Sequence, residues 1–239
     1  MVTAVILSGG SGVRAGQPVP KQFLTVNDIP VIVYTMKNIQ SIAQIENIVV
    51  VGPADWEGFI YSYAKQFGIS KLSKVVAGGE TRHESIYNGL RFLEGDGQTE
   101  KVCLIDANRP LIPQKVINDV IELADKCDCA MVLEPCYDSM FLSGDGVEVS
   151  ENIKRTTLFK QAGPECARLD TLLALYRDIN TENANELSTA GLAVSCGKKV
   201  LAAKGHIKCF KITTADDFDL FKAFLDAEAR SNIIREDIK

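Results

Sequence analysis

Short apolar runs alternate with helical periods along most of this chain, and this alternation restricts the possible folds more than any other feature. Runs typical of buried strands lie at residues 2–7, 48–52, 74–77, 102–106 and 130–133. Between them, apolar residues recur at helical spacing, as at Val116, Ile117, Val120, Ile121 and Ala124. Such alternation favours a mostly parallel sheet with helices on both faces. We therefore predict a Rossmann-like, doubly wound α/β fold that occupies residues 1–239 as a single domain.

The last part of the chain continues this alternation. Apolar runs at residues 200–203 and 207–212 predict two more strands. Two further helices are indicated by the apolar series Leu169, Leu172, Leu173 and Tyr176, and by Phe218, Phe221, Phe224 and Leu225. Thr213 or Thr214 is a candidate N-cap for the closing helix.

Residues 139–160 interrupt this alternation of strand and helix patterns. Residues 140–142 and 147–149 predict a hairpin around the turn at residues 143–146. A lone hairpin is only marginally stable in water, so it needs a surface to lie on. We predict a protruding β-arm at 139–160 that packs against another subunit and makes a homodimer. The alternative, that the arm folds back on its own domain, stays open.

Composition excludes several classes of protein. The 239 residues are 46% hydrophobic, enough for one sizeable core. A formal net charge of −5 argues against nucleic-acid binding over the whole surface. No apolar run approaches the 18 or more residues of a membrane span, and no basic leader precedes the first strand. We expect neither a membrane partner nor a signal peptide.

Cysteine usage points to a reducing compartment. The seven cysteines are odd in number and scattered, no C-x-x-C motif occurs, and the chain has only 2 histidines. A zinc site is therefore not expected, and reduced core thiols in the cytoplasm are.

The first strand runs directly into a glycine-rich loop, Ser8-Gly9-Gly10-Ser11-Gly12-Val13-Arg14, and Lys21 follows in Pro20-Lys21-Gln22-Phe23. Bare backbone N–H groups at the end of a strand suit phosphate oxygens. Arg14 and Lys21 add two positive charges at the same place. This segment predicts a nucleoside triphosphate site.

Three other interpretations compete for this loop. Residues 10–15 formally match the dinucleotide fingerprint G-x-G-x-x-A, but Pro18 and Pro20 follow where that motif needs a helix. A P-loop requires Gly-Lys-Ser/Thr, which is missing. A glycine-rich turn without a ligand stays open.

Unusual residues gather at the predicted carboxyl ends of strands, where open α/β sheets bind their ligands. Besides the glycine loop, these segments are Gly78-Gly79-Glu80-Thr81-Arg82-His83-Glu84-Ser85, Asp106-Ala107-Asn108-Arg109-Pro110, Asp138-Ser139 and Lys211-Ile212-Thr213. Together they make a site at this edge much more plausible than any one of them does alone.

Taken in order, these motifs resemble the polyol-phosphate cytidylyltransferases, a family with methylerythritol-phosphate and ribitol-phosphate branches. The family motifs A-x-G-x-G-x-R-M, P-K-Q, G-G-x-x-R-x-x-S, D-A-x-R-P and K-I/V-T have counterparts in the same order along nearly the whole chain, with Ala15 where Met is usual. The resemblance implies a fold of the nucleotide-diphospho-sugar transferase type. It also implies transfer of CMP from CTP to a small alditol-type phosphate, with release of pyrophosphate.

The resemblance also implies roles for individual residues. Arg14 and Lys21 would be catalytic, and Asp106 would hold Mg²⁺. The nucleotide would contact Ser8, Gly9, Gly10, Ser11, Gly12, Gly78, Gly79, Arg82, Ser85, Asp106 and Ala107. The acceptor phosphate would be bound by Arg109 and Lys211, together with Ser139 and Arg155, which would reach the partner subunit through the arm.

The acceptor side departs from the family pattern. Asn108 replaces a small apolar residue, Phe141 replaces lysine, and Gln161-Ala162-Gly163-Pro164-Glu165 stands in place of Q-T-P-Q. We infer an acceptor related to ribitol phosphate and methylerythritol phosphate but not necessarily either one. Two alternatives remain open: a silent CTP- or CDP-binding protein, and a nucleotidyltransferase that uses another nucleoside triphosphate.

Overall fold

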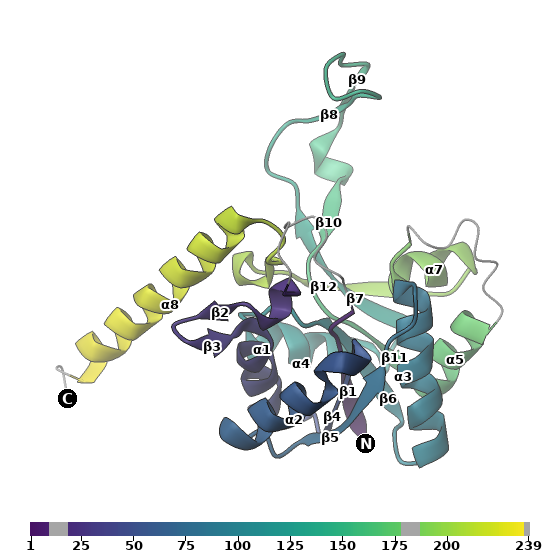
Figure 1. Cartoon of the computed structure of the whole chain (residues 1–239). Helices are drawn as coiled ribbons and strands as arrows, with labels where there is room; N and C mark the ends of the chain where they lie inside the picture. Colours follow the sequence, from purple (N-terminus) through teal and green to yellow (C-terminus); the bar gives the residue numbers. More distant parts are fainter. Residues whose placement is uncertain (10–18, 178–186, 237–239) are drawn as a thin grey trace.

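The computed structural model describes residues 1–9, 19–177 and 187–236, with no side-chain description for residues 231–236. One eight-stranded sheet forms the body, with the path β10-β7-β11-β6-β1-β4-β5 and with β12 paired to β7 (Figure 1). Its strands are β1 Val2–Leu7, β4 Asn47–Gly52, β5 Leu72–Ala77, β6 Lys101–Asp106, β7 Cys129–Pro135, β10 Phe159–Gln161, β11 Glu165–Arg168 and β12 Val200–Lys204.

Most of this sheet is parallel, as predicted. β1 pairs in parallel with β4 and with β6, β4 with β5, and β7 with β12. Two strands run the other way: β11 is antiparallel to both β6 and β7, and β10 is antiparallel to β7. Neither antiparallel strand is part of the alternation that the sequence shows, because each is only three or four residues long.

Helices cover both faces of the sheet and divide the core into two large clusters. One face is covered by α1 Val31–Gln40, α2 Glu57–Gln66 and α4 Gln114–Leu123. The other face is covered by α3 Arg82–Asp96, α5 Leu169–Arg177 and α7 Thr189–Ser195. Because β1 lies in the middle, its residues alternate between the two clusters: Ala4 and Ile6 face the first, Val5 and Leu7 the second.

The end of the chain differs from the sequence prediction. Residues 207–212 form no strand: Ile207–Cys209 is the 3₁₀ turn η5, and the following residues are irregular. Their backbone bonds go to the loop after β6, where the Ile212 N–H donates to the Asn108 carbonyl at 2.9 Å. Helix α8, Ala215–Glu236, then leads away from the body (Figure 1).

The backbone N–H groups just before α8 donate to a carboxylate and not to the hydroxyl of the predicted threonine N-cap. The Asp217 carboxylate accepts bonds from the N–H groups of Thr213 and Thr214, both at 2.8 Å. Burial raises the pKa of Asp217, but these donors outweigh it and hold the pKa below its usual value.

Residues 139–158 form an arm that stands away from the body (Figure 1), whereas residues 159–160 of the predicted arm belong to β10 of the main sheet, because they pair with β7. It contains β8 Met140–Leu142, β9 Glu151–Ile153 and the 3₁₀ turn η4 Arg155–Thr157. The first predicted strand is confirmed, but the second begins at Glu151 and not at Val147. The turn is longer than predicted because the Asp145 carboxylate accepts the N–H groups of Val147 and Glu148 at 2.8 and 2.9 Å.

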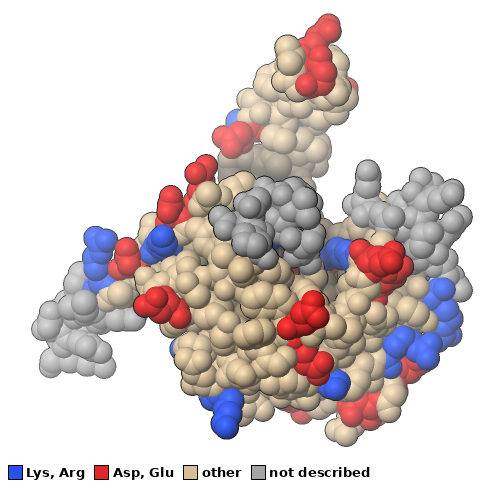
Figure 2. Space-filling model, viewed as in Figure 1, with Lys and Arg blue, Asp and Glu red and all other residues tan. Residues whose placement is uncertain are grey.

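The arm exposes apolar side chains. Its large hydrophobic residues with more than half of their surface in solvent are Phe141, Leu142, Val147 and Val149, and Tyr137 and Phe159 at its base are exposed to a similar extent. Acidic residues gather at its tip, as Figure 2 shows, whereas Lys and Arg on this face of the body are scattered. Within the described part of the chain, no helix has the length and apolarity needed to cross a membrane.

Two 3₁₀ turns and a small two-stranded ribbon complete the body near the start of the chain. The 3₁₀ turn η2, Lys21–Phe23, precedes the small ribbon of β2 Thr25–Val26 and β3 Ile29–Pro30. The 3₁₀ turn η3, Ala54–Trp56, follows β4. Phe23 stacks on Trp56 with ring centroids 3.9 Å apart and ring planes 7° apart, so the two turns are joined.

Candidate active site

The carboxyl ends of β1, β4, β5 and β6 meet at one edge of the sheet. The register pairs Leu7 with both Val51 and Asp106. Backbone bonds continue across the edge from the Gly78 N–H to the Gly52 carbonyl at 2.8 Å and from the Ala107 N–H to the Leu7 carbonyl at 2.9 Å. Segments that are far apart in sequence are therefore neighbours here, as the strand-end argument predicts.

Glycines at this edge let the side chains of Ser85 and Glu84 pack directly against the backbone. A Cβ atom on Gly78 would lie 3.0 Å from Ser85 Oγ, and one on Gly79 would lie 2.3 Å from Glu84 Cβ. A Cβ on Gly9 would also lie 3.4 Å from Ser85 Oγ. The structure thus brings Gly9, Gly78, Gly79 and Ser85 together. Their bare backbone permits close approach of a flat ring.

The first turn of α3 is fixed by a capping box. Thr81 Oγ1 accepts the Glu84 N–H at 3.1 Å, and Glu84 Oε2 accepts the Thr81 N–H at 3.3 Å. Within the same turn, the Gly79 N–H donates to Ser85 Oγ at 3.0 Å. These reciprocal bonds satisfy N–H groups that a helix start otherwise leaves unpaired. They also set the direction in which Arg82 leaves the helix.

The turn that carries Lys21 is tied to the end of β1. Gln22 is buried, and its side-chain amide donates to the Ser8 carbonyl. The neighbouring Phe23 is held by its stack on Trp56. Sequence reasoning missed the structural roles of Gln22 and Trp56. The remaining predicted loop residues, Gly10, Ser11, Gly12 and Arg14, lie outside the described residues.

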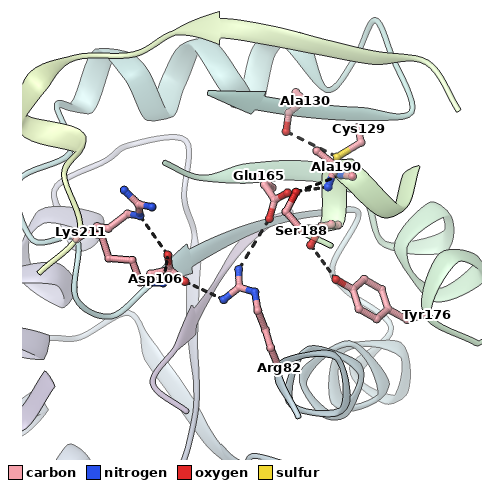
Figure 3. A network of polar contacts seen from close by, with 12 residues as sticks. Arg82, Asp106, Cys129, Ala130, Glu165, Tyr176, Ser188, Ala190 and Lys211 are labelled. Carbon is pink, nitrogen blue, oxygen red and sulfur yellow. Dashed lines mark hydrogen bonds and ion pairs between the residues drawn. The ribbon is translucent and has the colours of Figure 1, made fainter. Parts of the chain in front are cut away.

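Asp106 is the centre of a charged cluster at the end of β6 (Figure 3). Its Oδ1 accepts a bond from Arg82 Nη1 at 2.8 Å, and its Oδ2 lies 3.1 Å from both Arg109 Nε and Lys211 Nζ. Burial by itself raises the pKa of Asp106, but the three cations outweigh burial and hold it well below its usual range. Asp106 is therefore an anion at neutral pH.

Arg82 also faces a second acid, which sequence reasoning did not assign. Glu165 Oε2 lies 3.9 Å from Arg82 Nη2, and Glu165 Oε1 accepts the Ala190 N–H at 2.6 Å (Figure 3). Burial lowers the pKa of Arg82, but Asp106 and Glu165 reverse this and raise it. The available signal was an acid within the otherwise apolar stretch Pro164-Glu165-Cys166-Ala167.

The predicted acceptor residues divide into two groups. Arg109 and Lys211 join Asp106, although Lys211 follows no strand. Ser139 and Arg155 lie exposed on the arm, where Arg155 Nη1 donates to the Tyr137 carbonyl at 2.9 Å. The structure of the single chain does not bring these two arm residues to the cluster.

The departures from the family pattern also fall in different places. Asn108 is buried, and its side-chain amide donates to the Ile212 carbonyl at 2.7 Å, which anchors the segment that carries Lys211. Gly163 lies against Val132 of β7. Phe141 is exposed on the arm. Asn108 thus has a structural role that its place in the sequence does not indicate.

Two residues predicted to bind the nucleotide, Ala107 and Ser8, are buried. Ala107 is buried, and its carbonyl accepts the Thr35 hydroxyl at 2.6 Å. Ser8 is also buried, and its hydroxyl makes no hydrogen bond to any residue that the structure describes. Both lie at strand ends next to the glycines.

The residues at this edge fit one kind of metal site. Among the described residues, no group of three or more His, Cys, Asp or Glu side chains is arranged to hold a metal. Asp106 is the carboxylate at the end of β6, and both of its oxygens already contact cationic side chains. Mg²⁺ commonly binds through one or two carboxylates together with substrate phosphates. The donor set fits such a phosphate-borne Mg²⁺ and not a metal caged by protein alone.

Comparison with known proteins identifies relatives along the full chain. A family model described as IspD, 2-C-methyl-D-erythritol 4-phosphate cytidylyltransferase, matches residues 2–227. Ribitol-5-phosphate cytidylyltransferase of Lacticaseibacillus paracasei is 32% identical over 229 residues, which cover 94% of this chain and 98% of the relative. Ribitol-5-phosphate cytidylyltransferase of Streptococcus agalactiae serotype Ia is 33% identical over 236 residues, with coverages of 98% and 99%.

The other branch is also represented. The 2-C-methyl-D-erythritol 4-phosphate cytidylyltransferase of Pelotomaculum thermopropionicum is 29% identical over 227 residues, covering 95% of this chain and 94% of the relative. The crystal structure of 4-diphosphocytidyl-2C-methyl-D-erythritol synthase from Anaerococcus prevotii superposes with a TM-score of 0.81 at 22% identity, covering 94% of this chain and 96% of that one. This likeness confirms the predicted fold.

Proposed function

Because this chain belongs to the IspD family of cytidylyltransferases, we propose that it transfers CMP from CTP to a small alditol phosphate, with ribitol 5-phosphate as the first candidate. An oxygen of the acceptor phosphate attacks the α-phosphorus of CTP. The bond from that phosphorus to the bridging oxygen breaks, and pyrophosphate leaves. The observation that supports the proposal is the Asp106 cluster, which lies at the same edge of the sheet as the glycines.

The glycines and the loop after β1 would hold the nucleotide. Gly78, Gly79 and Ser85 offer a flat surface for the pyrimidine, next to Ala107 and Ser8. The backbone N–H groups of residues 9–12 suit the phosphates. Arg14 and Lys21 would stabilise charge on the α-phosphoryl group and on the leaving pyrophosphate. Because two anions must meet, positioning and charge neutralisation should supply most of the rate.

The cluster would receive the reacting phosphates. Arg82, Arg109 and Lys211 carry three positive charges against the two carboxylates of Asp106 and Glu165, which leaves one positive charge in excess for anionic substrates. Mg²⁺, when bound, supplies further neutralisation of the triphosphate, and Asp106 is the residue that would hold it. No covalent nucleophile is required.

The acceptor site would be completed by a second copy of the chain. Ser139 and Arg155 lie on the arm and do not reach the cluster of their own chain. The exposed apolar residues of the arm suit packing against another subunit, since a hairpin alone is only marginally stable. We therefore propose a homodimer in which each arm supplies Ser139 and Arg155 to the partner's site.

The choice of acceptor rests on the relatives. The ribitol-5-phosphate cytidylyltransferases of Lacticaseibacillus paracasei and Streptococcus agalactiae are 32% and 33% identical to this chain, against 29% for the methylerythritol-phosphate enzyme of Pelotomaculum thermopropionicum. All seven cysteines are free thiols, which fits the cytoplasm that we propose as the location of the enzyme.

Pyrophosphate release tests the proposal. The purified chain would be incubated with CTP, Mg²⁺ and one acceptor at a time: ribitol 5-phosphate, 2-C-methyl-D-erythritol 4-phosphate and other alditol phosphates. We expect turnover with ribitol 5-phosphate and a CDP-alditol product by mass spectrometry. Turnover with another acceptor would correct the substrate. Tight CTP binding without turnover on any acceptor would refute the proposed transfer and indicate a silent binding protein. Faster turnover with UTP than with CTP would refute the nucleotide assignment.

A further inference from the structure

A buried carboxylate lies beside the Asp106 cluster, and the proposed chemistry gives it no role. Glu165 is the first residue of β11, and its side chain is only 2% exposed. One oxygen accepts the Ala190 N–H at the start of α7 at 2.6 Å (Figure 3). A buried charge is costly unless it is paired and hydrogen-bonded. The other oxygen of Glu165 faces Arg82.

Arg82 is held between two acids that belong to neighbouring strands. Its Nη1 lies 2.8 Å from Asp106 on β6, and its Nη2 lies 3.9 Å from Glu165 on β11. β6 and β11 are paired, with Leu104 opposite Glu165, so the two acids keep a fixed separation. The two ends of one guanidinium thus have separate anchors. Without Glu165, the Arg82 guanidinium would keep its contact with Asp106 but would be free to rotate about it.

We propose that Glu165 is a positioning residue for nucleotide binding and transfer: it holds the Arg82 guanidinium in the single orientation in which it meets the phosphates. Glu165 itself touches no substrate. The inference rests on the proposed function, since it assumes that Arg82 acts on CTP. It adds that β11 and α7, which lie outside the glycine motifs, set the geometry of the nucleotide site.

Glu165→Gln tests this role because it keeps the shape of the side chain. The amide oxygen still accepts the Ala190 N–H, and only the charge toward Arg82 is lost. A purely structural role would lower thermal stability and leave the kinetics of the folded enzyme unchanged. The positioning role predicts that the CTP dissociation constant rises about 3- to 10-fold and that kcat falls about 10-fold, because misplaced groups lose rate steeply.

A double-mutant cycle with Arg82→Ala separates the two roles. If Glu165 acts through Arg82, Glu165→Gln changes CTP affinity and kcat less than about 2-fold once Arg82 is alanine. Equal effects in both backgrounds would overturn the proposal. A gain in CTP affinity of the same size in both would also overturn it, since Glu165 would then act only as a distant negative charge.

Two further variants serve as a control and as a replacement for Glu165→Gln. Glu100→Gln is the matched control, since Glu100 pairs with Arg168 at 3.0 Å near the other end of β11. It should leave CTP binding unchanged. If Glu165→Gln is too unstable to purify, Glu165→Asp keeps the charge and shortens its reach. It should weaken CTP binding about 2- to 5-fold when Arg82 is present and have no effect when Arg82 is alanine. Wild-type CTP binding and kcat in Glu165→Asp would overturn the proposal.

The readouts also separate this inference from the proposed function. CTP affinity is measured by calorimetry for every variant, independently of turnover. A wild-type chain that binds CTP but activates no acceptor would refute the proposed transfer, and the CTP cycle would still decide the role of Glu165. A chain that binds no CTP would refute both.

Discussion

Replacing Asp106 by asparagine should expose how much the charged cluster contributes to the fold. The substitution keeps the size of the side chain and removes the one negative charge that Arg82, Arg109 and Lys211 share. Three cationic groups then lie close together without that counter-ion. The amide nitrogen also cannot accept the bonds that one of the carboxylate oxygens accepted.

The expected loss follows from burial. Removing one partner of a fully buried pair costs about 3–5 kcal/mol, because a buried charge is left uncompensated. Here the Asp106 and Arg109 side chains are 12% and 13% exposed, but Arg82 and Lys211 are 39% and 40% exposed, so water offsets part of the loss. We expect a loss of about 2 kcal/mol, which for a chain of this length lowers Tm by about 4–8 °C.

A matched control lies at the other end of the same strand. Asp125 pairs with Lys101, the first residue of β6, at 2.7 Å, and the Asp125 side chain is 62% exposed. Because Asp125 is in solvent, although the Lys101 side chain is 14% exposed, Asp125→Asn should lower the free energy of unfolding by about 1 kcal/mol, less than Asp106→Asn. Both variants would be compared by urea unfolding and by thermal scans.

The contribution of Asp106 to the free energy of unfolding should also depend on pH. The fold lowers the pKa of Asp106, so its stabilising contribution is fully present above the unfolded pKa of about 4 and is lost as pH falls through the lower folded value. The stability difference between wild type and Asp106→Asn should stay constant from about pH 8 to pH 5 and shrink in more acidic solution. Pyrophosphate should stabilise the variant more than the wild type, because the variant has one more uncompensated positive charge. Equal unfolding midpoints for Asp106→Asn and Asp125→Asn would refute the reasoning.

The remaining predictions concern rate, metal and assembly. Lys21→Ala and Arg14→Ala should each reduce kcat by about 100-fold or more with unchanged circular dichroism, because each removes charge stabilisation of the transferred phosphoryl group; near-wild-type rates would exclude these roles. Chelation of Mg²⁺ by EDTA should abolish turnover, and added Mg²⁺ should restore it, whereas persistent activity would exclude the metal from the reaction. Phe141→Asp on the arm should convert a dimer to a monomer in light scattering, and a wild-type monomer would contradict the proposed assembly.

Much of this fold is predictable from the sequence because most of its parallel strands contain continuous apolar runs, although Ser73 and Lys74 interrupt β5. The strands that carry Leu7, Gly52, Ala77 and Asp106 end where the apolar runs end. Since the carboxyl ends of such strands share one edge, it was predictable as well that Gly9, Gly78 and Asp106 lie at the same edge of the sheet.

The missed features depend on contacts between distant segments. Residues 207–212 are as apolar as a strand, but the Ile212 backbone bonds to Asn108 and not to a neighbouring strand. β11 is only four residues long and antiparallel, so the alternating strand and helix patterns in the sequence do not reveal it. Glu165 acquires its role only because β11 lies beside β6, which brings it to Arg82. No local pattern encodes that pairing.

A crystal structure of the chain with CTP and Mg²⁺ would test the central claim most directly. We predict that the pyrimidine lies against Gly78, Gly79 and Ser85, and that the phosphates lie between the glycine loop, Lys21 and the Asp106 cluster. Binding of CTP at any other surface, with the carboxyl ends of β1, β5 and β6 free of nucleotide, would contradict the account.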